Sequence, residues 1–190
     1  MTDESLMAAY VQGDVRAFQT LFERLAPRLH GFFLRSMRDR AAADDLLQET
    51  FMKVHRARAT WQPDRPLLPW IFQVAARVRL DELRRRKRLP EDADEEALAR
   101  ADEAEAARTA QASVGDAARL ETQEAVRAAL DRLPESQRVV IHLHRYEGLT
   151  LGEIAKVLGT TEGAVKLRAF RGYERLRADL RPLLESEEAA

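Results

Sequence analysis

The chain has no cysteine, few aromatic residues and no long apolar run. None of its 190 residues is cysteine, and 6% are aromatic. The lack of cysteine excludes disulfides, thiol nucleophiles and thiolate metal sites. The most apolar run, LLPWIFQVAA, is much shorter than the ~18 residues that a membrane-spanning helix needs. The first ten residues, MTDESLMAAY, are acidic and contain no apolar signal core, so we expect a cytoplasmic protein that does not insert into membranes.

Charge is unevenly distributed along the chain, although the formal net charge is only -1. Residues 77–88 contain seven basic side chains against two acidic ones, whereas residues 90–131 contain twelve acidic side chains against four basic ones. Between 91 and 119, Leu98 and Val114 are almost the only large apolar residues. Such a segment cannot bury a core, so we predict a flexible acidic linker over residues 90–119.

Apolar residues on both sides of this linker recur at helical spacing. The first stripe consists of Val15, Phe18, Phe22, Leu25, Leu29, Phe32 and Phe33, and the second of Ala43, Leu47, Phe51 and Val54. A third segment runs from Trp70 to Leu83 and into the basic RRRKR. Four shorter helical patterns follow at 120–133, 135–146, 150–158 and 160–180. Sustained strand alternation is missing, so we predict an all-α protein with two small helical domains, 1–89 and 120–184.

The last two patterns predict a helix-turn-helix. Thr150 and Glu153 have the spacing of a capping box, and Gly159 follows the last apolar residue of the short helix. Thr160 is expected to cap the next helix. A short helix, a tight glycine turn and a second helix form the pattern that many DNA-binding proteins use.

The second of these helices has two unlike faces when residues are placed at about 100° intervals. The face expected in the core carries Val165, Ala169, Gly172, Tyr173, Leu176 and Leu180. The opposite face carries Leu167, Phe170, Arg171 and Glu174, flanked by Lys166, Arg168 and Arg175. Large apolar side chains among basic ones suit a DNA major groove, where basic groups meet phosphates or guanine and apolar groups meet thymine methyls. A solvated charged face is the simpler alternative.

Four blocks of sequence, in order, resemble the extracytoplasmic-function sigma factors, a two-domain class of bacterial transcription initiation factors. The first is Gly13, Asp14, Ala17, Phe18 and Leu21, and the second is ADDLLQETF at 43–51. The third is the W-I-F-Q-V-A segment at 70–75 with the basic helix after it, and the fourth is LPESQR at 133–138 followed by EIAKVLG and GAVK. The resemblance spans residues 5–183 and implies a protein that binds core RNA polymerase and promoter DNA, with an anti-sigma factor as a further partner.

The resemblance also implies roles for particular residues. Asp45, Gln48 and Glu49 match positions that hold a basic coiled coil on the largest polymerase subunit, and carboxylates suit such a partner. The loop and basic helix around Trp61, Arg77, Arg84 and Arg85 match the part that meets the minus-10 element. Both tryptophans could stack on bases; Trp70 is expected in the core, whereas for Trp61 the choice between core and stacking stays open, and it is named as a minus-10 contact. The helix-turn-helix residues Lys166, Leu167, Arg168, Phe170, Arg171 and Arg175 are expected to meet the minus-35 element.

The chain departs from the family pattern at two DNA-facing places. Ala76 and Arg77 replace a common Arg-Asn pair, and an arginine can only donate hydrogen bonds to a base edge. Ala164 and Leu167 replace common hydroxyl residues in the last helix. Promoter sequence therefore does not transfer from relatives to this chain.

Two other functions stay open at this stage: a sigma-like polymerase-binding adaptor, and a stand-alone helix-turn-helix regulator, neither of which opens promoters. An enzyme is not expected. His142 and His144 point to different faces of a helix, and the sequence has no phosphate-cradling glycine loop and no nucleophile motif. We accordingly expect no cofactor and no small-molecule substrate.

Overall fold

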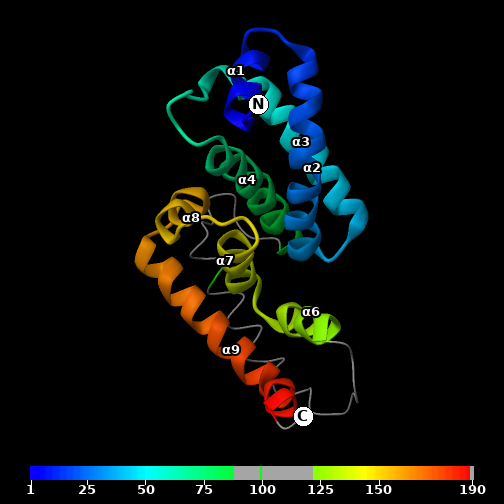
Figure 1. Cartoon of the computed structure of the whole chain (residues 1–190), viewed down its shortest axis with the longest axis vertical. Coiled ribbons are helices and arrows are strands. Elements are labelled where there is room, and N and C mark those ends of the chain that lie inside the picture. Colours follow the sequence, from blue (N-terminus) through cyan, green and yellow to red (C-terminus); the bar gives the residue numbers. More distant parts are fainter. Residues whose placement is uncertain (88–98, 100–121, 189–190) are drawn as a thin grey trace.

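The helices form two groups that meet near the middle of the molecule (Figure 1). The computed structural model describes residues 1–87, 99 and 122–188, with the side chains of 122–124 and 182–188 outside this description. We call residues 1–87 the N-terminal half and residues 122–188 the C-terminal half. Both contain helices and no strand among the described residues, which confirms the all-α prediction. The predicted linker lies outside the described residues.

The N-terminal half consists of four α-helices and one short 3-10 turn. They are α1 (Asp3–Val11), α2 (Val15–Met37), α3 (Arg40–Ala57), the turn Arg58–Thr60 and α4 (Leu67–Lys87). The sequence pattern did not predict α1. Asp14 and Asp39 begin α2 and α3 because each side chain accepts hydrogen bonds from two backbone N–H groups of the first helical turn. These caps fix where the two longest helices of this half start.

The buried side of α2 differs from the predicted stripe at its N-terminal end. Leu25, Leu29, Phe32 and Phe33 are buried as expected, but Val15 is 74% exposed and Phe22 is 41% exposed. Ala17 and Leu21 are buried in their place, and in α3 Leu46 is buried while Leu47 is only partly covered. The buried side of α2 differs from the predicted stripe because α1 also packs against α2, so the core includes the side that carries Ala17 and Leu21.

The C-terminal half has α6 (Thr122–Arg132), α7 (Glu135–Arg145), α8 (Leu151–Leu158) and the long α9 (Glu162–Glu188). Helix α9 packs against the other three, and Val165 and Ala169 are buried in that contact. It approaches α7 closely at Gly172, where an added Cβ would lie 2.6 Å from Ile141 Cδ1. The buried apolar residues of α7, α8 and α9 belong to the same core cluster as those of the N-terminal half.

The two halves are packed against one another. Helix α4 lies against α8, and α2 lies against α7, as Figure 1 shows. Several of the contacts between the halves are polar, and they join residues 56 to 119 positions apart in the chain. Among the described residues no helix is both long enough and apolar enough to cross a membrane.

Stability measurements can test the assignment of the α2 core. Leu29→Ala should lower the free energy of unfolding by about 2–5 kcal/mol, because a fully buried side chain is lost. Val15→Ala, from the same predicted stripe but exposed, should change it by less than about 0.5 kcal/mol. Urea unfolding followed by circular dichroism measures both. Equal losses in the two variants would show that the sequence stripe, rather than the structure, describes the core.

Candidate nucleic-acid interface

The turn between α8 and α9 is built as the sequence predicts, with one change. The backbone N–H of Glu153 donates to Thr150 Oγ1 at 3.2 Å, and Thr150 N donates to Glu153 Oε2 at 2.8 Å, so the capping box is present. Gly159 ends α8 in the left-handed region with φ of 66°. The cap of α9 is Thr161, whose hydroxyl accepts from Ala164 N at 3.2 Å. Thr160, the cap expected from the sequence, lies one residue before Thr161, and its backbone N–H donates to Ala155 O at 3.0 Å.

The outward face of α9 carries the mixed apolar and basic residues that the face calculation placed there. Leu167 is 49% exposed and Phe170 is 65% exposed, and Lys166 and Arg171 are exposed beside them. Val165 on the opposite side is fully buried. The rotation of this helix is therefore confirmed, and no described element covers these two apolar side chains. We call Lys166, Leu167, Phe170 and Arg171 the α9 face.

Two arginines that were expected to flank the α9 face are instead buried or half-buried within the C-terminal half. Arg168 is only 6% exposed, and half-buried Arg175 donates to Gln137 Oε1 at 3.3 Å. Arg168 lies three residues after Val165 and four before Gly172, so it shares their side of the helix. The prediction that Arg168 lies on an exposed flank is wrong, because α9 packs on both α7 and α8 and buries a wider arc than one stripe.

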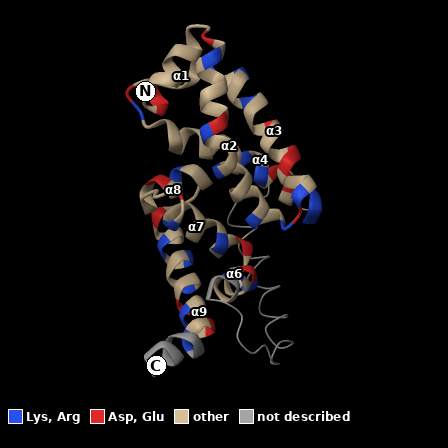
Figure 2. Ribbon diagram, turned by 45° about the vertical axis from the view of Figure 1, so that its right-hand side comes forward, with Lys and Arg blue, Asp and Glu red and all other residues tan. Residues whose placement is uncertain are grey.

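Basic and acidic groups alternate near the α9 face (Figure 2). Lys166 Nζ lies 2.8 Å from Glu162 Oε1, and this hydrogen bond and charge lower the pKa of the Glu162 carboxyl. Arg177 pairs with Glu174 further along the helix. Arg171 makes no ion pair with any described residue. Its guanidinium is thus the cation of this face most directly available to an anionic ligand.

A second surface, on α3, is acidic. Asp45, Gln48 and Glu49 are all exposed, on the side of α3 away from the buried Leu46 and Thr50. Glu49 pairs with Lys53 at 2.9 Å, whereas Asp45 has no ion pair among the described residues. We call Asp45, Gln48 and Glu49 the acidic face of α3.

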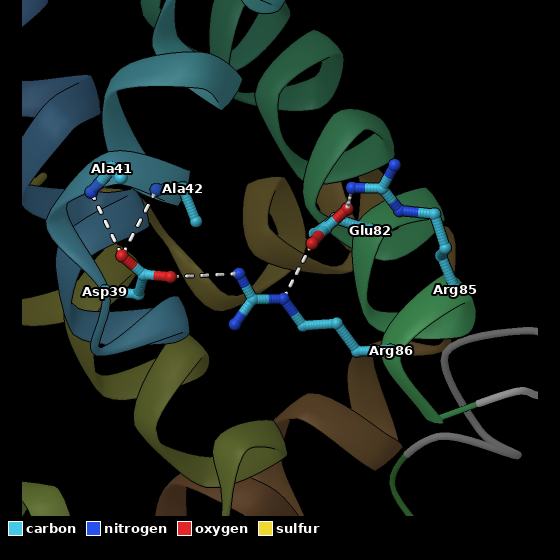
Figure 3. Close-up of polar contacts among 6 residues, drawn as sticks. All are labelled: Asp39, Ala41, Ala42, Glu82, Arg85 and Arg86. Atoms are coloured by element: carbon cyan, nitrogen blue, oxygen red, sulfur yellow. Dashed lines mark hydrogen bonds and ion pairs between the residues drawn. The ribbon is translucent and has the colours of Figure 1, made fainter.

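The basic end of α4 is tied to neighbouring carboxylates (Figure 3). Glu82 pairs with both Arg85 and Arg86, and Arg84 Nη1 lies 3.2 Å from Asp81 Oδ1. Arg86 also lies 3.6 Å from Asp39, the residue that caps α3. Arg77 is exposed and has no ion pair within the described part of the chain. Figure 3 shows how this network joins the end of α4 to the start of α3, a link that the sequence pattern did not reveal.

Trp70 is less buried than expected, and Trp61, whose place the sequence left open, lies in the core. Trp61 is 5% exposed and belongs to the core, whereas Trp70 is only partly buried. Both line a pocket that also contains Gln73 of α4 and Lys156 of α8. The minus-10 contact predicted for Trp61 is not accessible in this arrangement, because its side chain is buried in the core.

An apolar groove between α2 and α3 was not predicted. It is lined by Phe18, Phe22, Leu47, Phe51 and Met52, and the rings of Phe22 and Phe51 lie 4.6 Å apart. The groove borders the acidic face of α3, since Gln48 belongs to both. Helical spacing placed Phe22 in the core, but its side chain is 41% exposed and lines this groove.

Family models match both halves of the chain. Residues 21–89 match Sigma-70 region 2, and residues 123–176 match Sigma-70, region 4. The RNA polymerase sigma factor CarQ of Myxococcus xanthus is 35% identical over 175 residues, which cover 90% of this chain and 93% of that protein. The ECF RNA polymerase sigma factor SigM of Mycobacterium tuberculosis is also 35% identical, over 92% of this chain and 83% of that protein.

Solved structures share the fold. CnrH in complex with the cytosolic domain of CnrY has a TM-score of 0.62 and 28% identity, over 95% of this chain and 97% of CnrH. The sigma factor RpoE in complex with the anti-sigma factor NepR from Bartonella quintana has a TM-score of 0.64 and 22% identity, over 88% of this chain and 98% of RpoE. With 22% identity, the similarity to RpoE concerns the fold only.

The rotation of α9 can be checked by two matched serine substitutions. Val165→Ser should destabilise the C-terminal half by at least about 2 kcal/mol, because it removes buried apolar area and buries a hydroxyl. Leu167→Ser should change the free energy of unfolding by no more than about 0.5 kcal/mol, which is the helix propensity difference of an exposed site. Thermal melting followed by circular dichroism separates them. A Leu167→Ser loss as large as that of Val165→Ser would place Leu167 in the core.

Proposed function

The chain belongs to the sigma-70 family of RNA polymerase sigma factors, in its extracytoplasmic-function class, and we propose that it binds core polymerase, directs it to promoters and helps to open them. It is an alternative sigma factor. The observation that carries this conclusion is the occurrence of region 2 and region 4 in one chain, with relatives at 35% identity over most of both lengths. We place its activity in the cytoplasm, where core polymerase and promoters are found together.

The proposed function divides between the two halves. Residues 1–89 form the domain that binds polymerase and the minus-10 element, and residues 120–184 form the domain that binds the minus-35 element. The positions of the two family matches support these boundaries. Residues 90–119 are the proposed acidic linker between them.

The acidic face of α3 is the proposed contact with core polymerase. Its three residues project from a helix whose other side is buried, so a partner can reach them without unfolding the half. Exposed carboxylates form charge-assisted hydrogen bonds with arginine-rich surfaces. The neighbouring apolar groove adds area that a partner helix can bury.

Promoter contacts are proposed on α4 and on the α9 face. On α4 we assign the minus-10 contacts to Arg77, Arg84 and Arg85, of which Arg77 alone is not offset by a described carboxylate. Trp61 would contribute there only if its loop moved, since it is buried. On the α9 face, Lys166 and Arg171 suit phosphates or guanine, and Leu167 and Phe170 suit thymine methyls and sugars. Arg175 and the buried Arg168 support this face from within.

An anti-sigma factor is a further proposed partner. The likeness to CnrH, solved with the cytosolic domain of CnrY, supports it. The adaptor hypothesis, in which the chain binds polymerase without opening promoters, differs from this proposal in one measurable respect, namely promoter-dependent transcription.

Charge reversal on α3 tests the polymerase contact. Asp45→Lys with Glu49→Lys should raise the Kd for core polymerase about 10- to 100-fold, because like charges then face a basic partner. The control carries the same charge change at exposed carboxylates elsewhere in this half, Glu23→Lys with Asp64→Lys, and should bind as the parent does. Fluorescence titration with core polymerase gives both constants. If the α3 double variant binds as tightly as the control, these carboxylates only solvate the helix.

Transcription with purified core polymerase and a randomised promoter library tests the function itself. The parent chain should produce run-off transcripts from a defined set of sequences. Lys166→Ala with Arg171→Ala should reduce their yield about tenfold or more and blur the minus-35 preference, since a base-reading arginine supplies ~1–3 kcal/mol of discrimination.

Two further observations complete that experiment. The control Arg127→Ala with Arg145→Ala removes two exposed arginines of α6 and α7, outside the α9 face, and should leave the yield unchanged. Polymerase binding by the parent without any promoter-dependent transcript would favour the adaptor hypothesis over a sigma factor.

A further inference from the structure

The groove between α2 and α3 is an apolar surface that no described element covers. Its volume is about 670 Å³, and its walls include Phe18, Phe22, Leu47, Phe51 and Met52. The side chain of Met52 is 49% exposed. Large apolar side chains gathered in one exposed place are typical of a surface that binds another protein.

The two ends of this groove carry opposite charge. At one end lie Asp44, which lines the groove, and the exposed Asp45 beside it in the chain. Asp44 Oδ1 is 3.1 Å from His30 Nε2 of α2, and Asp45 has no ion pair among the described residues. At the other end of α3, His55 and Arg56 line the groove. A partner that fits this site therefore carries a cation at one end and an anion at the other.

The α9 face and the start of its helix carry the complementary set of side chains. Leu167 and Phe170 are exposed and apolar, and the exposed Arg171 beside them makes no ion pair with any described residue. Glu162 is exposed at the start of the same helix, where Lys166 pairs with it. Two apolar side chains thus lie along α9 between a carboxylate and a guanidinium.

The spacing of these charges also fits when the two helices lie antiparallel. Asp45 and Arg56 are ~17 Å apart along α3, at ~1.5 Å per residue. Glu162 and Arg171 are ~14 Å apart along α9 by the same measure. An antiparallel arrangement brings Arg171 toward Asp45 and Glu162 toward Arg56, with the apolar side chains of α9 over the groove.

One molecule in this arrangement cannot make the contact with itself. Helix α3 packs against α2 and α4, whereas α9 packs against α6, α7 and α8. Figure 1 shows α3 and α9 in different groups of helices, on opposite sides of the place where the halves meet. An α9 face that reaches the groove must therefore come from a second molecule.

We propose that the chain self-associates by inserting the α9 face of one copy into the α2–α3 groove of another. The contact is heterologous, because it joins two different surfaces, so each molecule can both offer an α9 face and receive one. A contact made by one helix face in one groove is small, which suits a weak, reversible association. Salt weakens it, because exposed charges are screened.

Self-association covers both proposed contact surfaces, a consequence that rests on the proposed function. The groove borders the proposed polymerase contact, and the α9 face is the proposed minus-35 contact. Core polymerase therefore competes with the second copy for the groove, and by mass action it draws the chain out of the self-associated form. An α9 face inserted in a groove is not available to DNA.

Sedimentation velocity of the full chain tests the contact without polymerase or DNA. The weight-average mass of the parent should rise over roughly 5–200 μM, the range of a weak interface. Met52→Lys places a cation in the groove, and Phe170→Glu places a carboxylate on the α9 face. Both sites are exposed, so each variant should melt as the parent does and stay monomeric. The controls Gln12→Lys and Arg127→Gln make the same two charge changes at exposed residues outside both surfaces, and they should associate as the parent does.

Mixing the two variants gives the sharpest comparison. Met52→Lys keeps an intact α9 face, and Phe170→Glu keeps an intact groove. An equimolar mixture should therefore form pairs, and no larger species, at concentrations where each variant alone is monomeric. A parent that stays monomeric over the whole range would overturn the proposal, as would variants that associate like the controls or a mixture that forms no pairs.

Core polymerase separates this proposal from the proposed function. Added to the fluorescently labelled parent at a concentration where it is associated, polymerase should remove the self-associated species in proportion to the amount added. Self-associated chain that also carries bound polymerase in its grooves would overturn the competition. If the chain does not bind polymerase while the mixed variants form the expected pairs, the sigma-factor proposal fails and the self-association stands.

Discussion

The buried pairing of Arg79 with Glu135 is the interaction on which the arrangement of the two halves depends. Burial alone would raise the pKa of the Glu135 carboxyl, but the nearby guanidiniums of Arg79 and Arg138 outweigh it and hold the pKa below its usual range. The carboxylate is therefore ionised at neutral pH and pairs with a cation that has no exposed surface. Because Arg79 belongs to the N-terminal half and Glu135 to the C-terminal half, this ion pair fixes how the two halves lie relative to one another.

The proposed contact surfaces share one physical design. Each is the outward side of a helix whose inward side is committed to a core, as in α3, where Leu46 and Thr50 are buried behind Glu49, and in α9, where Val165 is buried behind Leu167. Contacts to a partner and contacts within the fold then come from different residues. Substitutions on the outward side can change binding while the free energy of unfolding stays near that of the parent.

The surfaces differ in how much of their charge is already paired. On α4, Glu82 and Asp81 offset Arg84, Arg85 and Arg86, so the RRRKR run is less basic than its sequence suggests. Glu162 similarly holds Lys166 on α9. Arg77 and Arg171 are the arginines of these surfaces without a described carboxylate partner. DNA phosphates that contact these paired arginines and Lys166 must compete with the carboxylates that already bind them. Binding then favours DNA sequences that also make contacts through their bases.

The sequence by itself determined the helical fold class, the capping box at Thr150, the glycine turn at Gly159 and the rotation of α9. These features depend on neighbours within one or two helical turns, where spacing and backbone chemistry suffice. It also led to the family through its four blocks. Only the tertiary structure decided which of Trp61 and Trp70 is buried, that Arg168 faces inward, that Phe22 lines a groove, and that Arg79 is paired with Glu135. Periodicity reports that a helix has an apolar side, but it does not report which other helix covers that side or how wide the covered arc is. Those answers came from α1 packing on α2, from α9 lying on two helices, and from residues 56 positions apart meeting across the contact between the halves.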